Sequence, residues 1–166
     1  MSTKAGDFVE EFSLKPEVVL QTYAKAETLQ WVERWRSVYA GGERAPGLKQ
    51  YMWHTFSWGA YPSVSGEEAR QLYAAHRYFE VIVLSNDRKT AFRSASLPVS
   101  DRLFDFYVFP PDLAWTMAFT HEDGWLGPYF AKHHDYEAMI DKAKRQRLAA
   151  DSKAMELERA KQNGWL

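Results

Sequence analysis

The chain has 166 residues, of which 46% are hydrophobic and 26% charged, and its formal net charge is −1. A single globular domain of this size can bury roughly 70% of the surface that its unfolded chain would expose. The near-neutral charge argues against nucleic acid or an anionic membrane as the partner, since both demand a basic excess. The absence of cysteine excludes disulfides, thiolate metal ligands and cysteine nucleophiles.

The first 15 residues carry Asp7, Glu10 and Glu11 and have no apolar core, so they do not resemble a secretory signal. No uninterrupted apolar stretch approaches the roughly 18 residues that a membrane-spanning helix needs. We therefore expect a cytoplasmic protein without a membrane partner.

Residues 16–39 have the pattern of a helix. Pro16 suits a first helical turn, and Gly41 and Gly42 end the segment. A spacing of three or four places one apolar stripe on this helix: Leu29, Val32, Trp35 and Tyr39. The following segment, residues 48–60, is dense in aromatic residues, and its period does not decide between helix and strand.

A second helix is predicted from the sequence Ser65-Gly66-Glu67-Glu68, which has the form of a capping box, to about His76. Four strand candidates follow at hairpin spacing with no helix between them: residues 78–84, 89–95, 104–109 and 114–120. This order predicts an α+β fold with a small antiparallel sheet of about four strands, flanked by the N-terminal helices.

Residues 133–162 are predicted to form a long C-terminal helix whose apolar residues thin out beyond Lys144. Its mixed charges are typical of a solvated face. We therefore divide the chain into an α+β domain, residues 16–132, and a charged helical extension, residues 133–166.

Two groups of residues are candidates for a functional site. His121 and Glu122 lie at the end of a predicted strand, where a catalytic or metal-binding loop is common. His54 and the pair His133-His134 could complete the site. The spacing matches no zinc template, and the chain has neither a Gly-x-Ser-x-Gly elbow nor a phosphate-binding loop. Neither a metal nor a cofactor is therefore predicted.

The second group is acidic. Between residues 101 and 125 there are five acids and one base, Arg102. An acidic surface with aromatic anchors suits a basic partner, because charge complementarity speeds encounter and buried rings supply affinity. The expected contact residues lie in loops: Asp112, Glu122, Asp123 and Trp125. Alternatively, the acids only keep the edges of the sheet soluble.

Three blocks resemble a bacterial family known as domain of unknown function 4275. They are Trp53-His54-Thr55-Phe56-Ser57-Trp58, Gly66-Glu67-Glu68-Ala69, and the closing pair Ala114 to Glu122 with Gly127-Pro128-Tyr129-Phe130. The resemblance covers roughly residues 31–130, and the long charged helix lies outside it. The family has no established activity, so His121 and Glu122 inherit a motif and not a role; small families of this kind recur among immunity proteins.

From the missing catalytic templates, the acidic region and this resemblance we expect a non-enzymatic immunity-type protein. It would bind and neutralise a cognate bacterial toxin, for example a nuclease. The alternative is a metal-dependent or acid–base hydrolase using His54, His121 and Glu122, which requires these three residues to converge. A third possibility is a scaffold protein whose terminal helix docks a partner.

Overall fold

A computed structural model describes residue 12 and residues 14–40, 51–77, 79–99, 105–122 and 125–165. The chain divides into two compact units, residues 1–133 and residues 134–166. Each unit is considered by itself below.

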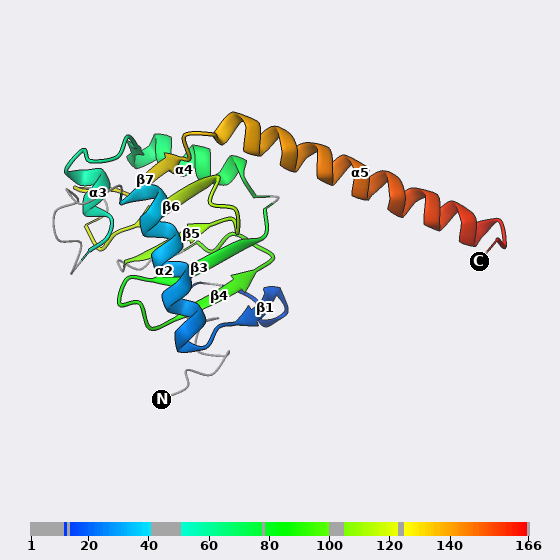
Figure 1. Cartoon of the computed structure of the whole chain (residues 1–166), viewed down its shortest axis with the longest axis horizontal. Helices are drawn as coiled ribbons and strands as arrows, with labels where there is room; N and C mark the ends of the chain where they lie inside the picture. The colour runs from blue at the N-terminus through cyan, green and yellow to red at the C-terminus, as the bar shows by residue number, and fades with distance from the viewer. Residues whose placement is uncertain are drawn as a thin grey trace. The chain divides into compact units, whose positions relative to one another are not determined.

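The first unit is built on a seven-stranded sheet in which every pairing is antiparallel (Figure 1). The strands are β1 (Val19–Thr22), β2 (Val64–Ser65), β3 (Val81–Ser85), β4 (Ala91–Ser94), β5 (Phe106–Phe109), β6 (Trp115–Phe119) and β7 (Tyr129–Lys132). Their order across the sheet is β1-β4-β3-β5-β6-β7-β2. The α+β class is confirmed, but the expectation of about four strands was wrong: β1, β2 and β7 extend the four predicted strands on both sides.

Residues 16–24 do not belong to the first helix. Pro16–Val18 form a single 3-10 turn (η1), and β1 then pairs with β4. The helix α2 begins later, at Lys25, and spans Lys25–Tyr39. The prediction failed here because a proline at a first helical turn also fits an isolated turn, and pairing with β4 determines the rest.

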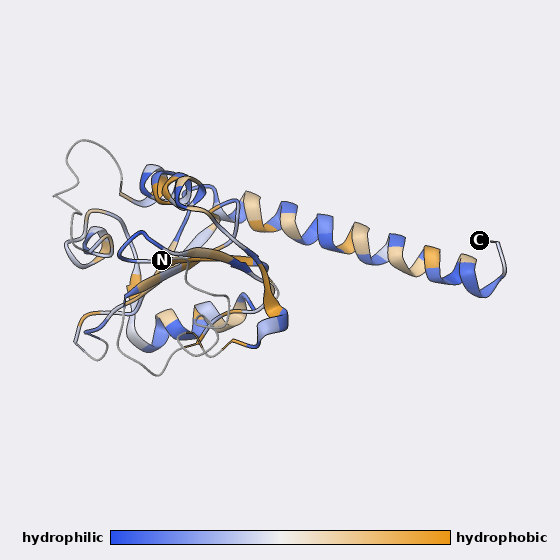
Figure 2. Ribbon diagram, turned by 90° about the horizontal axis from the view of Figure 1, so that it is seen from below, coloured by the Kyte–Doolittle hydropathy of each residue, from blue (hydrophilic) through white to orange (hydrophobic). Residues whose placement is uncertain are grey.

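Helices cover both faces of the sheet (Figure 2). On one face, Trp35 of α2 packs on Tyr107 of β5, and its indole N–H donates to Thr116 Oγ1 at 2.9 Å. On the other face, Tyr73 of α4 (Gly66–Ala75) packs edge-on against Trp115 and Phe119. Trp115, Thr116 and Phe119 all lie in β6, so its side chains alternate between the two layers, as the pleat of a strand requires.

The helix α4 lies where the capping box predicted it. The Ser65 side chain, however, makes no capping hydrogen bond in the structure. The backbone supports this helix start instead: the N–H of Gly66 donates to the carbonyl of Pro128 at 3.0 Å, next to the pairing of β2 with β7. Ala69, Tyr73 and His76 are buried.

Aromatic side chains from the helices and strands fill much of the core. Trp31, Trp35, Tyr73, Tyr107 and Trp115 are buried. Phe79 is half-buried, and Phe104 lies outside the described residues. The aromatic residues in and next to the family blocks differ in exposure: Trp53, Phe56, Tyr129 and Phe130 are buried, whereas Trp58 and Trp125 are exposed.

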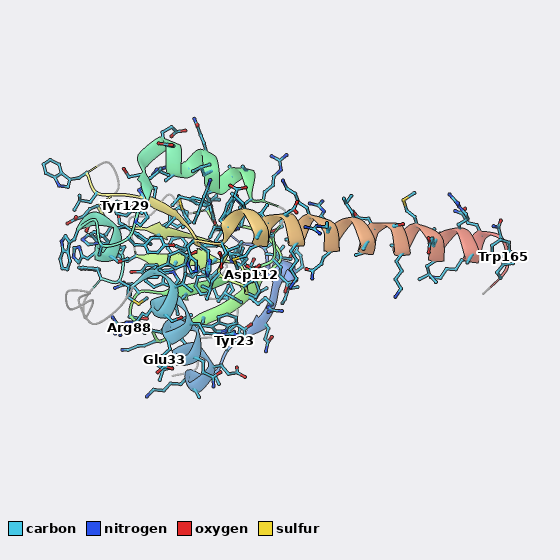
Figure 3. The ribbon with its side chains drawn as sticks, turned by 45° about the horizontal axis from the view of Figure 1, so that its top comes forward. Tyr23, Glu33, Arg88, Asp112, Tyr129 and Trp165 are labelled. Carbon is cyan, nitrogen blue, oxygen red and sulfur yellow. The ribbon has the colours of Figure 1, made fainter. Side chains whose placement is uncertain are left out.

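The second unit is a single helix, α5 (Tyr136–Gln162), with Trp165 just beyond its end (Figure 3). It carries several exposed apolar side chains: Leu148, Met155 and Leu157. Within the described ranges, no helix combines the length and the apolar character needed to cross a bilayer.

Candidate functional site

The antiparallel register brings residues from four strands to one end of the sheet. Phe106 of β5 pairs with both Ser85 of β3 and Phe119 of β6, and Ala118 pairs with Tyr129 of β7. The residue before β5, Asp105, therefore lies beside the residues that follow β3 and β6. These are Asn86 and His121.

A short helix, α3 (His54–Ser57), lies at the same end of the sheet (Figure 1). Trp53 fixes it there through two hydrogen bonds: its backbone N–H donates to the Tyr107 hydroxyl at 2.9 Å, and its indole N–H donates to Asp105 Oδ1 at 2.8 Å. Burial raises the pKa of Tyr107, so its hydroxyl stays protonated and donates to Asn86 Oδ1 at 2.6 Å.

The carboxylate of Asp105 is the centre of this arrangement. It accepts hydrogen bonds from the indole of Trp53 and from two groups of His121, the backbone N–H at 3.2 Å and the ring Nδ1 at 2.9 Å from Oδ2. A carboxylate only accepts, so the pairing places a proton on Nδ1 of His121. In the neutral ring, Nε2 is then the basic atom, and it lies 3.6 Å from Glu122 Oε1.

His54 lies between two indole rings. Its ring stacks on Trp58 with a centroid distance of 4.2 Å and an interplanar angle of 5°, and Trp53 lies 4.3 Å away on a tilted plane. Burial lowers the pKa of His54 below its usual value, and the carboxylates of Glu122 and Asp105 partly oppose this shift. Its Nδ1 lies 2.9 Å from Ser57 Oγ.

Tyr51 joins the two histidines. Its ring centroid is 5.0 Å from that of His121 and 5.8 Å from that of His54. The two histidines therefore lie at the same end of the sheet. We refer to the following residues together as the strand-end cluster: Tyr51, Trp53, His54, Trp58, Asp105, His121 and Glu122.

The turn after β6 presents an exposed indole next to this cluster. The backbone N–H of Trp125 donates to the Glu122 carbonyl at 2.9 Å, while the Trp125 side chain is among the most exposed apolar groups, at 86% for the residue. Trp58 is 53% exposed. Glu122 is half-buried, and its charge contributes to raising the pKa of Tyr129, after burial as the main cause.

The four predicted contact residues do not form one group. Asp112 precedes β6, whereas Glu122 and Trp125 follow it, so Asp112 lies at the opposite end of this strand. Figure 3 shows Asp112 well separated from Tyr129, which begins β7 beside Glu122. Asp123 lies outside the described residues.

The three residues of the hydrolase hypothesis lie at the same end of the sheet. The rings of Tyr51 and Trp53 contact both histidines, and Glu122 Oε1 lies 3.6 Å from Nε2 of His121. Their geometry is not that of a metal centre. His121 Nε2 and Glu122 Oε1 are 3.6 Å apart, but in the part of the chain that the structure describes the ligand atoms of His54, His121 and Glu122 do not all lie within 4.8 Å of one another. The Nδ1 atom of His121 is also taken by Asp105.

Sequence reasoning missed Asp105 as a site residue. A signal was available: if predicted strands 104–109 and 114–120 form a hairpin, the start of the first lies beside the end of the second. That pairing places Asp105 next to His121. Tyr51 and Trp53 had no comparable signal, because residues 48–60 had no assignable period.

Comparison with known proteins agrees with the motifs. The family model described as Domain of unknown function (DUF4275) matches residues 23–130, about two thirds of the chain. The chain belongs to the DUF4275 family. The matched range contains the whole strand-end cluster and Trp125 and ends before α5. Among curated proteins and among solved structures, no match was found.

Proposed function

We propose that this DUF4275 protein is a cytoplasmic, non-enzymatic immunity-type protein that binds and neutralises a cognate toxin at the end of the sheet where β6 stops. The observation that carries the proposal is a pair of exposed indoles at this end of the sheet: Trp125, in the same turn as Glu122, and Trp58, which stacks on His54. Exposed tryptophans next to an acidic group have the composition of interface anchors.

Three structural features support this assignment of the surface. Trp125 is 86% exposed, so its indole has a large apolar surface that binding to a partner would remove from water. The residues behind this surface are held in place, because the Asp105 carboxylate accepts hydrogen bonds from both Trp53 and His121. Glu122 belongs to the same turn as Trp125 and supplies the negative charge that a basic toxin would meet.

The proposal is tested by co-expression with the toxin encoded beside this gene. We expect the wild type to protect the host and to copurify with the toxin, and Trp125→Ala to lose both properties. Trp165→Ala is the matched control, because Trp165 is 74% exposed but belongs to the second unit and follows α5. Absence of a neighbouring toxin gene and of any copurifying partner would contradict the proposal.

A second candidate function is acid–base catalysis centred on His121. The specific observation in its favour is the Asp105 carboxylate on Nδ1, which fixes one tautomer and leaves Nε2, beside Glu122, available to accept a proton. His54 lies in the same aromatic cluster, where burial lowers its pKa and keeps it neutral near pH 7. The hydrogen-bonded pair of His121 and Asp105 supports acid–base chemistry better than metal-dependent chemistry, because Nδ1 of His121 already donates to Asp105.

This candidate is tested with a panel of ester and phosphodiester substrates between about pH 5 and pH 9, the range in which histidine titrates. Turnover by the wild type that is lost in both His121→Asn and Asp105→Asn would support it. Turnover that survives in His121→Asn, or no turnover of any member of the panel, would reject it. Asp112→Asn is the control for a general effect of removing one acidic group.

A further inference from the structure

The helix α5 carries two large apolar side chains that are open to solvent. Leu148 is 70% exposed and Met155 is 66% exposed. Two helical turns separate them, so they lie on the same face of α5. Leu157 lies about half a turn from Leu148 around the axis, on the opposite side of the helix. We refer to the side of α5 that carries Leu148 and Met155 as the 148/155 face.

The charge of α5 changes sign along this face. Residues 142–147 carry four bases and no acid, whereas residues 148–158 carry three acids and one base. All of these charged residues are exposed. Because the positive stretch precedes the negative one, the helix is complementary in charge to its own reverse.

Two pairs of charged residues flank the 148/155 face. At about 100° per residue, Arg145 and Glu156 lie on one flank. Lys144 and Glu158 lie on the other flank. On each flank the base lies toward the N-terminus of α5 and the acid toward its C-terminus.

Two copies of α5 can lie side by side in a parallel or an antiparallel orientation. In a parallel pair in register, each residue lies opposite itself, so bases face bases and acids face acids. In an antiparallel pair centred between residues 151 and 152, Leu148 of each copy lies opposite Met155 of the other. The same register brings the base of each flank beside the acid of that flank on the other copy, and the two-fold axis repeats every contact. Charge complementarity therefore favours the antiparallel pair.

One of the flanking bases already has a partner within the helix. The guanidinium of Arg145 donates to Asp141 Oδ2 at 2.6 Å, and the two side chains are 76% and 62% exposed. Exposed pairs of this kind contribute little to stability. A guanidinium has several N–H donors, so Arg145 can keep this bond and also reach a second carboxylate. The pair within the helix is therefore compatible with a pair between helices.

We propose that α5 is a self-association helix, through which two copies of the chain pair antiparallel along the 148/155 face. Arg145 of each copy faces Glu156 of the other copy. Lys144 likewise faces Glu158. The occupant of this face is a second copy because the charge order of α5 complements its own reverse. The inference is independent of the proposed function, since α5 follows the family range and contains no residue of the strand-end cluster.

The contact between the two helices is small, so the association is weak. Each copy contributes two large apolar side chains, and Asp151 lies close to the two-fold axis, near its own copy. Small interfaces that depend on exposed ion pairs bind weakly, so we expect a dissociation constant on the order of 100 µM.

The test is sedimentation equilibrium of the full-length protein from about 10 µM to about 1 mM, a range that brackets the expected constant. The average mass of the wild type should rise with concentration above the 19.3 kDa of one chain. Leu148→Gln should raise the dissociation constant at least about tenfold, because each dimer loses two leucine contacts. Leu157→Gln is the matched control on the opposite side of α5 and should change the constant less than about twofold.

Ser152→Leu should give the opposite result. Ser152 lies between Leu148 and Met155 on the same face, so a leucine there extends the apolar contact and should lower the dissociation constant at least about threefold. Tighter association cannot result from an unfolded helix. Circular dichroism checks that the helix content of each variant equals that of the wild type.

Charge reversal tests the orientation of the pair. The flank of Lys144 and Glu158 is used, because Arg145 also bonds Asp141. Lys144→Glu and Glu158→Lys each place like charges side by side and should raise the dissociation constant at least about threefold. The double variant restores opposite charges and should return to within about twofold of the wild type. In a parallel pair these two positions do not meet, so the double variant would show no recovery.

Three results would overturn the inference. The first is the mass of one chain at every concentration. The second is an equal effect of Leu148→Gln and Leu157→Gln. The third is a charge-reversed double variant that associates no better than either single variant.

Discussion

His121 and Asp105 are joined by two hydrogen bonds. Nδ1 of His121 lies 2.9 Å from Oδ2 of Asp105, and the His121 backbone N–H lies 3.2 Å from Oδ1. Sixteen residues separate them in sequence, and the pair connects the turn after β6 to the beginning of β5. Because Oδ1 also receives the Trp53 indole N–H, this carboxylate also holds the beginning of α3.

The first prediction concerns Asp105→Asn. The amide has one acceptor oxygen in place of two, so at least one of its three donor groups loses its partner. We expect the free energy of unfolding to fall by about 1.5–3 kcal/mol, the range for hydrogen bonds to charged groups. Urea denaturation measures this free energy.

Asp112→Asn is the matched control. The Asp112 carboxylate is exposed and accepts a hydrogen bond from the backbone N–H of Ala114, so we expect a loss below about 1 kcal/mol. Equal losses in the two variants would contradict a central role for Asp105.

The second prediction concerns Gly127, in the turn between β6 and β7. Its φ is +91°, and a Cβ at this position would lie 2.9 Å from two side-chain atoms of Thr120. Gly127→Ala should therefore destabilise the domain by about 2–4 kcal/mol, from a strained backbone and a steric clash together.

Gly59→Ala separates these two causes, because Gly59 has a φ of +71° and a Cβ added there would meet no atom within 4 Å. It should cost only about 1–2 kcal/mol. The comparison is made by thermal unfolding, and a smaller loss in Gly127→Ala than in Gly59→Ala would count against the packing described for this turn.

The third prediction concerns the pH dependence of stability. Burial against indole rings lowers the pKa of His54 in the folded state, so near pH 7 it is mostly neutral in both states and has little effect on stability. As the pH falls through the unfolded value of about 6.5, the unfolded state binds the proton first and stability decreases. The decrease continues until the pH reaches the lower folded-state pKa. Chemical denaturation of His54→Gln between pH 7 and pH 5 should therefore show a smaller decrease than the wild type. An equal or larger decrease in the variant would show that His54 is not held neutral by its surroundings.

The fourth prediction concerns the packing of α2 on the sheet. Trp35 is fully buried, and its indole N–H donates to Thr116 Oγ1. Trp35→Phe removes that donor and leaves a void, so we expect a loss of about 1–3 kcal/mol in the free energy of unfolding. Trp165→Phe, at an exposed position outside the sheet unit, should change it by less than about 0.5 kcal/mol. Guanidinium denaturation compares the two. A wild-type stability in Trp35→Phe would mean that α2 does not depend on this contact.

The centre of the sheet was predictable, but its edges were not. The strands β3, β5 and β6 are largely apolar and are bounded by turn residues, so their own composition identifies them. β4 is less apolar and is identified by its hairpin spacing from β3. β1 and β2 are short edge strands that exist because β4 and β7 offer them hydrogen-bonding groups. No local pattern encodes such pairing. β7 was missed for a related reason: Tyr129–Lys132 follows a Gly-Pro turn and was attributed to a motif block without a strand assignment.

The candidate site shows the same division. His54, His121 and Glu122 stand out in the sequence because their residue types and positions indicate chemistry. Their convergence depends on the register of β5 against β6 and on the position of α3, which two hydrogen bonds of Trp53 determine. Asp112 looked equivalent to Glu122 by charge, yet the five residues of β6 separate them. Charge counted along the chain does not reveal which end of a strand an acid occupies.

The most direct test of the proposed function is the affinity of the protein for its neighbouring toxin, measured by isothermal titration calorimetry with Trp125→Ala and Trp165→Ala. Loss of a central aromatic anchor costs about 2 kcal/mol or more, which corresponds to a dissociation constant at least about 30-fold higher. We expect this weakening for Trp125→Ala and a wild-type constant for Trp165→Ala. Equal constants for the two variants would show that the end of the sheet at Trp125 is not the surface that binds the toxin.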